Sequence, residues 1–174
     1  PGEIGCFLSH RQAWQALLDS DHDTALILED DAQIDPELVA EVCASLRGDW
    51  PYVQLQTKVR GLKVAKDSAP QLHAFQPVPL RTTAQLLTRA AAQALLNQTD
   101  QIDRPIDTFL QMTWVHGIKI ATAYPSGVSL AADGVAASTI QQTDVPKKRL
   151  SLGRDLKRWT YRRRINALAR GQRL

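Results

Sequence analysis

Three consecutive acids, Glu29, Asp30 and Asp31, follow a short apolar run in the stretch TALILEDDAQID. Like charges held this close repel one another unless a cation lies between them. A hard divalent ion such as Mg²⁺ or Mn²⁺ prefers carboxylate oxygens and often bridges to phosphate, so the cluster predicts a site for a metal-bound nucleotide. The alternative is a solvated acidic turn that leads to a helix cap at Asp35.

The apolar run at residues 25–28 is too short for a helix and is bounded by polar residues, which predicts a buried central strand. Ligands of open α/β sheets bind at the carboxyl ends of such strands. The apolar spacing predicts an amphipathic helix over residues 3–19 just before it. Asp35 followed by Pro36 and Glu37 marks the start of another helix, because Asp caps and Pro suits the first helical position.

The rest of the chain alternates in the same way. We expect helices over 36–47, 89–96 and 103–113, strands over 52–56, 82–87 and 117–124, and mostly loop over 57–81. This order indicates an α/β sheet domain. No apolar run reaches the roughly 20 residues that a membrane-spanning helix needs. The two cysteines, Cys6 and Cys43, show neither a metal-binding nor a redox spacing.

Charge divides the chain into two parts. Residues 147–174 contain eleven Lys and Arg and one acid, Asp155, a net charge of +10; because the whole chain carries +3, residues 1–146 carry −7. We therefore expect a domain over 1–146 and a basic amphipathic tail over 147–174. Leu152, Leu156 and Trp159 share one helical face of the tail, and Tyr161, Ile165 and Leu168 share a second. This pattern suits a helix on an anionic membrane surface, with Trp159 and Tyr161 at the level of the lipid headgroups; the alternative is a solvated basic tail.

The block PGEIGCFLSHRQAWQALLDSDHDTALILEDD closely resembles glycosyltransferase family 25, which contains bacterial lipooligosaccharide sugar transferases and the transferase halves of collagen-modifying enzymes. A second block, with TTAQLLTRAAAQALL, RPIDTFL and HGIKI, agrees in order and spacing, so the resemblance covers residues 2–130. Two departures stand out. The sequence begins at the first motif, so we expect the family's N-terminal strand–helix unit to be missing, and Gln85 stands where the family generally has an aromatic residue.

The resemblance implies a GT-A-like (Rossmann-like) mixed sheet flanked by helices, with a basic C-terminal helix. It assigns Asp31 to coordination of Mn²⁺ or Mg²⁺, and Glu29 and Asp30 to the ribose or to completing the metal shell. Ser9 and His10 are the other candidates for binding the nucleotide sugar. His10 is equally interpretable as a structural helix histidine.

Two further roles come from the same resemblance. Asp107, in Pro-Ile-Asp, is the candidate base that deprotonates the acceptor, or alternatively an acid that satisfies a helix N-terminus. Asp103 is interpreted as the cap of that helix. His116 is the candidate late metal ligand, or alternatively a loop histidine.

The function implied is a metal-dependent inverting transfer of a hexose, galactose from UDP-galactose, to a lipopolysaccharide or lipooligosaccharide acceptor. The enzyme would be cytoplasmic and peripheral to the inner membrane, held there by its basic tail, and we expect no nucleic-acid partner. The alternative function is a catalytically inactive fragment or pseudoenzyme that acts as a membrane-surface binding module.

Overall fold

A computed structural model describes residues 2–45, 49–56, 59, 68–131, 159–165 and 167 of the chain. The helices and strands, in chain order, are α1 (Gly2–Asp19), β1 (Thr24–Leu28), β2 (Ala32–Ile34), α2 (Pro36–Ser45), β3 (Tyr52–Leu55), β4 (Gln71–His73), β5 (Ala84–Thr88), α3 (Arg89–Asn97), α4 (Ile106–Leu110), α5 (Thr113–His116), β6 (Ile120–Tyr124) and β7 (Val128–Leu130). Residues 159–165 are also helical. Within these ranges, no helix is both long enough and apolar enough to cross a bilayer.

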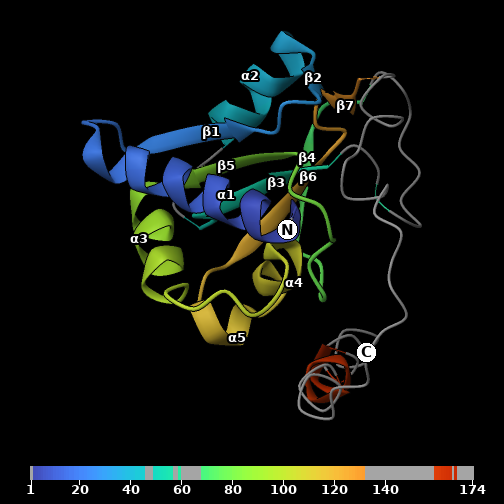
Figure 1. Ribbon diagram of the computed structural model, residues 1–174. Coiled ribbons are helices and arrows are strands. Elements are labelled where there is room, and N and C mark those ends of the chain that lie inside the picture. Colours follow the sequence, from blue (N-terminus) through green and yellow to red (C-terminus); the bar gives the residue numbers. More distant parts are fainter. Residues whose placement is uncertain are drawn as a thin grey trace.

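The centre of the fold is a five-stranded mixed sheet in the order β1-β5-β3-β6-β4 (Figure 1). Strands β3 and β6 run parallel, and the other neighbouring pairs are antiparallel. A second, two-stranded sheet joins β2 and β7. A mixed sheet flanked by helices confirms the predicted α/β, Rossmann-like fold class.

Helices cover both faces of the large sheet. Residues of α1, α3 and α4 form one apolar cluster with Tyr52, and α2 forms a second cluster with Val53 and Leu55. Successive side chains of a strand point to opposite faces, so β3 contributes to both clusters and is buried along its whole length. Trp14 of α1 is fully buried in the first cluster, as a core residue should be.

Strand β1 lies at an edge of the sheet, so the prediction of a central strand is wrong. It pairs with β5, where Leu26 lies opposite Leu86, and its other edge has no strand partner within the described ranges. Ala25 and Ile27 pack on the first cluster while Leu26 packs on the second. An unbroken apolar run therefore indicates a strand that packs against apolar residues on both faces of the sheet. An edge strand can meet that condition as well as a central strand.

Local sequence patterns correctly predicted the positions of most of the other helices and strands. The backbone N–H groups of Glu37 and Leu38 donate to Asp35 Oδ1 (3.1 and 3.3 Å), which confirms the predicted cap of α2. The predicted end of that helix, at residues 47–48, lies outside the described residues. The short strands β2 and β7 were not predicted, because three residues each are too few to show an alternating pattern.

The predicted helix over 103–113 is divided into α4 and α5. Pro105, and not Asp103, occupies the N-cap of α4, and it makes no side-chain cap hydrogen bond. The predicted cap role of Asp103 is therefore wrong: its carboxylate oxygens accept hydrogen bonds from the Arg104 guanidinium (2.6 and 2.8 Å). Strand β6 starts only at Ile120, because Gly117 ends α5 in a left-handed conformation (φ 71°).

The described part of the tail contacts the body of the protein at α4 and α5. The Tyr161 hydroxyl donates to Gln111 Oε1, and the Tyr161 ring lies 6.5 Å from the Trp114 ring. The Arg164 guanidinium lies 4.8 Å from the same indole centre. The predicted boundary at residue 146, and the predicted face residues Leu152, Leu156 and Leu168, fall outside the described residues.

Of the described glycines Gly5, Gly117 and Gly127, Gly127 leaves the least room for a side chain. It has φ +70°, and a Cβ added there would lie 2.7 Å from the Leu38 Cβ and 3.0 Å from the Asp35 carbonyl oxygen. We expect Gly127→Ala to lower the free energy of unfolding by about 1–3 kcal/mol, measured by urea denaturation. Gly5→Ala is the control, because Gly5 is helical with nothing within 4 Å of the new Cβ. It should leave stability equal or raise it by about 0.5–1 kcal/mol; equal losses in both variants would contradict the argument.

Candidate functional site

The three acids occupy a tight turn at the end of β1. The Ala32 N–H donates to the Glu29 carbonyl (3.1 Å), which closes a four-residue turn, and the Glu29 N–H donates to the Thr83 carbonyl (2.9 Å). The three side chains of the turn differ in exposure: Glu29 and Asp31 are half-buried and Asp30 is exposed. The stretch is thus a turn, as the alternative interpretation held, but only one of its three acids is fully open to solvent.

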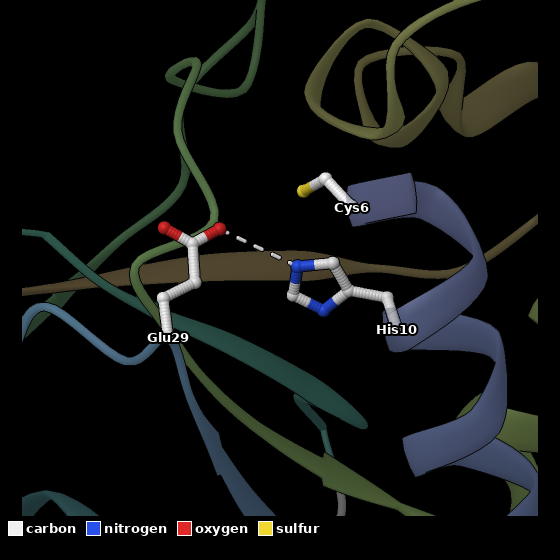
Figure 2. Close-up of side chains that lie close together, drawn as sticks. All are labelled: Cys6, His10 and Glu29. Atoms are coloured by element: carbon white, nitrogen blue, oxygen red, sulfur yellow. Dashed lines mark hydrogen bonds and ion pairs between the residues drawn. The ribbon is translucent and has the colours of Figure 1, made fainter. Parts of the chain in front are cut away.

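Glu29 belongs to a cluster with His10 and Cys6 (Figure 2). Cys6 and His10 lie four residues apart on α1, so both side chains project from one face of the helix. The ligand atoms of the three residues all lie within 4.8 Å of one another. His10 is only 4% exposed, and its Nε2 lies 3.4 Å from Glu29 Oε1. The Thr82 hydroxyl donates to the same oxygen (2.6 Å).

Gln85 sets the orientation of the His10 ring. It is fully buried on β5, and its side-chain N–H donates to His10 Nδ1 (2.8 Å). A histidine that accepts at Nδ1 carries its proton on Nε2, which directs the N–H toward Glu29. The buried amide of Gln85 therefore determines the immediate surroundings of His10.

Electrostatics connect this cluster with Asp107. Burial raises the pKa of the Cys6 thiol to about 11, with smaller contributions from the negative charges of Glu29 and Asp107. Burial also acts to raise the pKa of Glu29, but hydrogen bonds from His10 and Thr82 outweigh it and lower that pKa on balance. At neutral pH the cluster therefore holds a neutral thiol beside an ionised carboxylate.

Asp107 lies in the first turn of α4, half-buried. Its Oδ1 accepts hydrogen bonds from the Thr108 N–H (2.6 Å) and the Thr108 hydroxyl (3.3 Å). Its charge also contributes, after burial, to a raised pKa at Tyr161. The fold thus brings Asp107 within electrostatic range of Cys6, although 101 residues separate them in the sequence.

Asp31 carries an uncompensated polar atom. Its Oδ1 is buried and has no hydrogen-bond partner in the described part of the chain, while its backbone carbonyl accepts from the Ala131 N–H (2.9 Å). A buried carboxylate oxygen without a partner is costly, and a bound cation removes that cost. The chemistry of Asp31 and its neighbour Asp30 therefore fits the predicted Mn²⁺ or Mg²⁺.

His116 and Ser9 are engaged in their own local structure. The buried His116 donates from Nε2 to the Leu110 carbonyl and accepts at Nδ1 from the Ile118 N–H, both at 3.1 Å. Burial lowers its pKa, so the ring is neutral and both nitrogens are occupied. This geometry does not support a metal-ligand role for His116. The exposed Ser9 hydroxyl donates to the Gly5 carbonyl of its own helix (3.1 Å).

A pocket of about 660 Å³ lies beside the β2–β7 sheet and does not coincide with the predicted site. Its lining includes Gln33, Asp35, Gln56 and Ser126. None of the residues predicted to bind donor, metal or acceptor contributes to it.

Sequence reasoning did not assign Cys6 or Thr82 to the site, and it singled out Gln85 only as a departure from the family pattern. For Cys6 a signal was present, because a cysteine and a histidine four residues apart in a predicted helix share one face. Thr82 and Gln85 gave no such signal, since their partners lie 53 and 75 residues away.

The fold and the turn of acids at a strand end define an α/β protein of the Rossmann-like class. The sequence narrows this class further: residues 1–110 match the profile of glycosyltransferase family 25, described as "LPS biosynthesis protein". The chain belongs to that family.

Individual relatives are distant and much longer. Procollagen galactosyltransferase 1 of Danio rerio is 27% identical over 124 residues, which are 65% of this chain and 20% of the relative. A glycosyltransferase 25 family member of Aedes aegypti is 37% identical over 62 residues, 33% of this chain and 10% of the relative. Procollagen galactosyltransferase 2 of Mus musculus is 26% identical over 77 residues, 41% and 12% respectively. The chain thus matches a fifth or less of these relatives' length.

The lowered pKa of Glu29 gives a pH dependence of stability. A group whose pKa is lower in the folded state stabilises the fold above its unfolded pKa, about 4.3 for Glu, and that contribution disappears as pH falls through the folded pKa. We expect Glu29→Gln to lose less stability than the wild type between about pH 6 and pH 3, measured by urea denaturation. Glu41→Gln, on the exposed face of α2, is the control. Parallel curves for wild type and Glu29→Gln would contradict the argument.

Proposed function

We propose that this chain is the donor-binding and catalytic part of a metal-dependent, inverting glycosyltransferase that uses a UDP-sugar. The observation that carries the proposal is the buried, unpartnered Oδ1 of Asp31 in the acidic turn of a glycosyltransferase family member. Asp31, with Asp30 beside it, would hold Mn²⁺ or Mg²⁺. When bound, such an ion neutralises negative charge on the departing diphosphate.

The donor side of the site is formed by α1 and the acidic turn. Glu29, kept ionised by its hydrogen bonds, supplies an acceptor for ribose hydroxyls, and Asp30 is exposed next to it. The rigid His10 orients Glu29 and lies on the donor side, together with the exposed hydroxyl of Ser9. These residues position the nucleotide sugar and do not take part in bond breaking.

Asp107 is the proposed base. Thr108 holds one carboxylate oxygen through two hydrogen bonds, which leaves the second oxygen to take the proton of the acceptor hydroxyl. Its electrostatic effect on Cys6 from α4 supports a role beside the donor-binding residues. Attack by the deprotonated hydroxyl from the side opposite the diphosphate inverts the configuration of the sugar.

The proposed donor sugar is galactose, and the proposed acceptor is a lipopolysaccharide or lipooligosaccharide. The names of the Danio rerio and Mus musculus relatives, galactosyltransferases, support the sugar, and the family description supports the acceptor. Screening a panel of UDP-sugars for slow donor hydrolysis tests the sugar directly.

Two variants separate donor binding from catalysis. Calorimetric titration with UDP and Mn²⁺ should show metal-dependent binding that Asp31→Asn removes and Asp107→Asn retains. Asp107→Asn should lower kcat by about 10²–10⁴-fold, because a general base is lost. Asp103→Asn is the control, since Asp103 interacts with Arg104. A folded wild-type protein without metal-dependent UDP binding would favour the alternative, an inactive membrane-surface module.

The basic tail supports docking to an anionic membrane at the cytoplasmic face of the inner membrane. Tyr161 packs toward the body of the protein, which corrects the prediction that places it among lipid headgroups. Trp159 is 53% exposed, and Arg162 and Arg163 are also exposed, with Arg163 stacked 4.6 Å from the Trp159 ring centre. These three residues form the outward face that would meet the membrane.

We expect the full chain to co-sediment with vesicles that contain phosphatidylglycerol. The triple variant Trp159→Ala, Arg162→Ser, Arg163→Ser should lose most of that binding. Tyr161→Phe is the control, because it alters the contact with Gln111 and leaves the outward face intact. Binding unchanged in the triple variant would exclude this surface.

A further inference from the structure

Three potential metal ligands of different chemistry lie close together: the Cys6 thiol, the His10 imidazole and the Glu29 carboxylate. Figure 2 shows the thiol, the imidazole and the carboxylate turned toward one another, from α1 and from the end of β1. All three ligand atoms lie within 4.8 Å of each other. Because α1 presents Cys6 and His10 from consecutive turns, the two side chains keep this spacing without any loop rearrangement.

The distance between His10 and Glu29 suits two ligands of one cation as well as the long hydrogen bond that joins them in the absence of a metal. At 3.4 Å, Nε2 and Oε1 are farther apart than a normal N–H···O bond, about 2.9–3.0 Å. Two ligands at 2.0–2.1 Å from a tetrahedral Zn²⁺ would be about 3.3 Å apart. This pair of ligand atoms therefore has the spacing of two ligands on a tetrahedral ion, and the Cys6 thiol lies within 4.8 Å of both.

Buried neighbours hold both ligands in the way that metal sites require. The Thr82 hydroxyl fixes Glu29 Oε1 at 2.6 Å, and the Gln85 side chain contacts His10 Nδ1 at 2.8 Å. Gln85 is fully buried, and its Oε1 has no partner among the described residues. Since an amide can accept as well as donate, rotation of this side chain would let Oε1 accept a proton carried on Nδ1. The Nε2 lone pair would then be available to a metal.

We propose that Cys6, His10 and Glu29 form a binding site for Zn²⁺ or a similar borderline-soft cation. A thiolate and an imidazole favour such ions over Mg²⁺ and Mn²⁺, so this site is chemically distinct from the one at Asp31. Binding releases the thiol proton of Cys6 to solvent and moves the imidazole proton from Nε2 to Nδ1. The fourth coordination position stays open to water or to an oxygen of a bound ligand.

The proposal concerns binding alone and does not depend on the transferase reaction. When a cation occupies the site, that cation lies between the nucleotide sugar and the side chains of His10 and Glu29. A protein that binds Zn²⁺ here but shows no UDP binding would leave this inference intact while removing the proposed function.

Cobalt is the probe, because a Co²⁺–thiolate bond gives a charge-transfer band in the near ultraviolet. Titration of the metal-stripped full chain with Co²⁺ should produce this band together with the visible bands of four-coordinate cobalt, and Zn²⁺ should displace both. Excess Mg²⁺ should not. Cys6→Ser should lose the charge-transfer band, whereas Cys43→Ser, which removes the other cysteine, should keep it.

A second variant tests the supporting contact without removing a ligand. Gln85→Leu should weaken Co²⁺ binding by about 10–100-fold while the thiolate band keeps its position, because the partner of His10 Nδ1 is lost. Circular dichroism of each variant confirms that it is folded. Absence of the band in the wild type, its survival in Cys6→Ser, or its loss in Cys43→Ser would each overturn the proposal.

Discussion

The site depends on a buried chain of hydrogen bonds that runs from Gln85 through His10 to Glu29 and Thr82. It joins α1 to the sheet at the point where β1 ends. Polar groups buried in this way are costly when unpaired, so each member restricts the orientation of the next. Because His10 contacts Gln85 on one side and Glu29 on the other, it links α1 to the sheet and restricts the orientation of the first acid of the turn.

This constraint gives three adjacent acids three different environments. Glu29 is turned inward and kept ionised by its donors, Asp30 faces solvent, and Asp31 keeps a buried oxygen without a partner. A turn closed by one backbone hydrogen bond is sufficient to separate them. The three adjacent charges are tolerable here because Glu29 is hydrogen-bonded and Asp30 is exposed to solvent, while a cation held by Asp31 and Asp30 would remove the cost of the buried Asp31 oxygen.

The basic side chains of the C-terminal helix at residues 159–165 also lie in different environments. The helix at 159–165 turns Tyr161 and Arg164 toward Trp114 and Gln111, and leaves Trp159 and two arginines outside. A basic tail is therefore neither wholly solvated nor wholly available for binding. Its inward side lies close enough to Asp107 for that carboxylate to act on the pKa of Tyr161, which connects the tail to the catalytic end of the proposed site.

The sequence by itself determined the order and type of the main elements, because apolar spacing over 3–19, the cap at Asp35 and the alanine-rich helix at 89–96 are local properties. It also singled out Glu29, His10 and Asp107. Only the tertiary structure decided that β1 lies at an edge, that Cys6 joins His10 and Glu29, and that His116 is occupied by its own backbone. These outcomes depend on which distant segments become neighbours. A one-dimensional pattern does not encode that, since strand order and loop paths are set by packing of the whole domain.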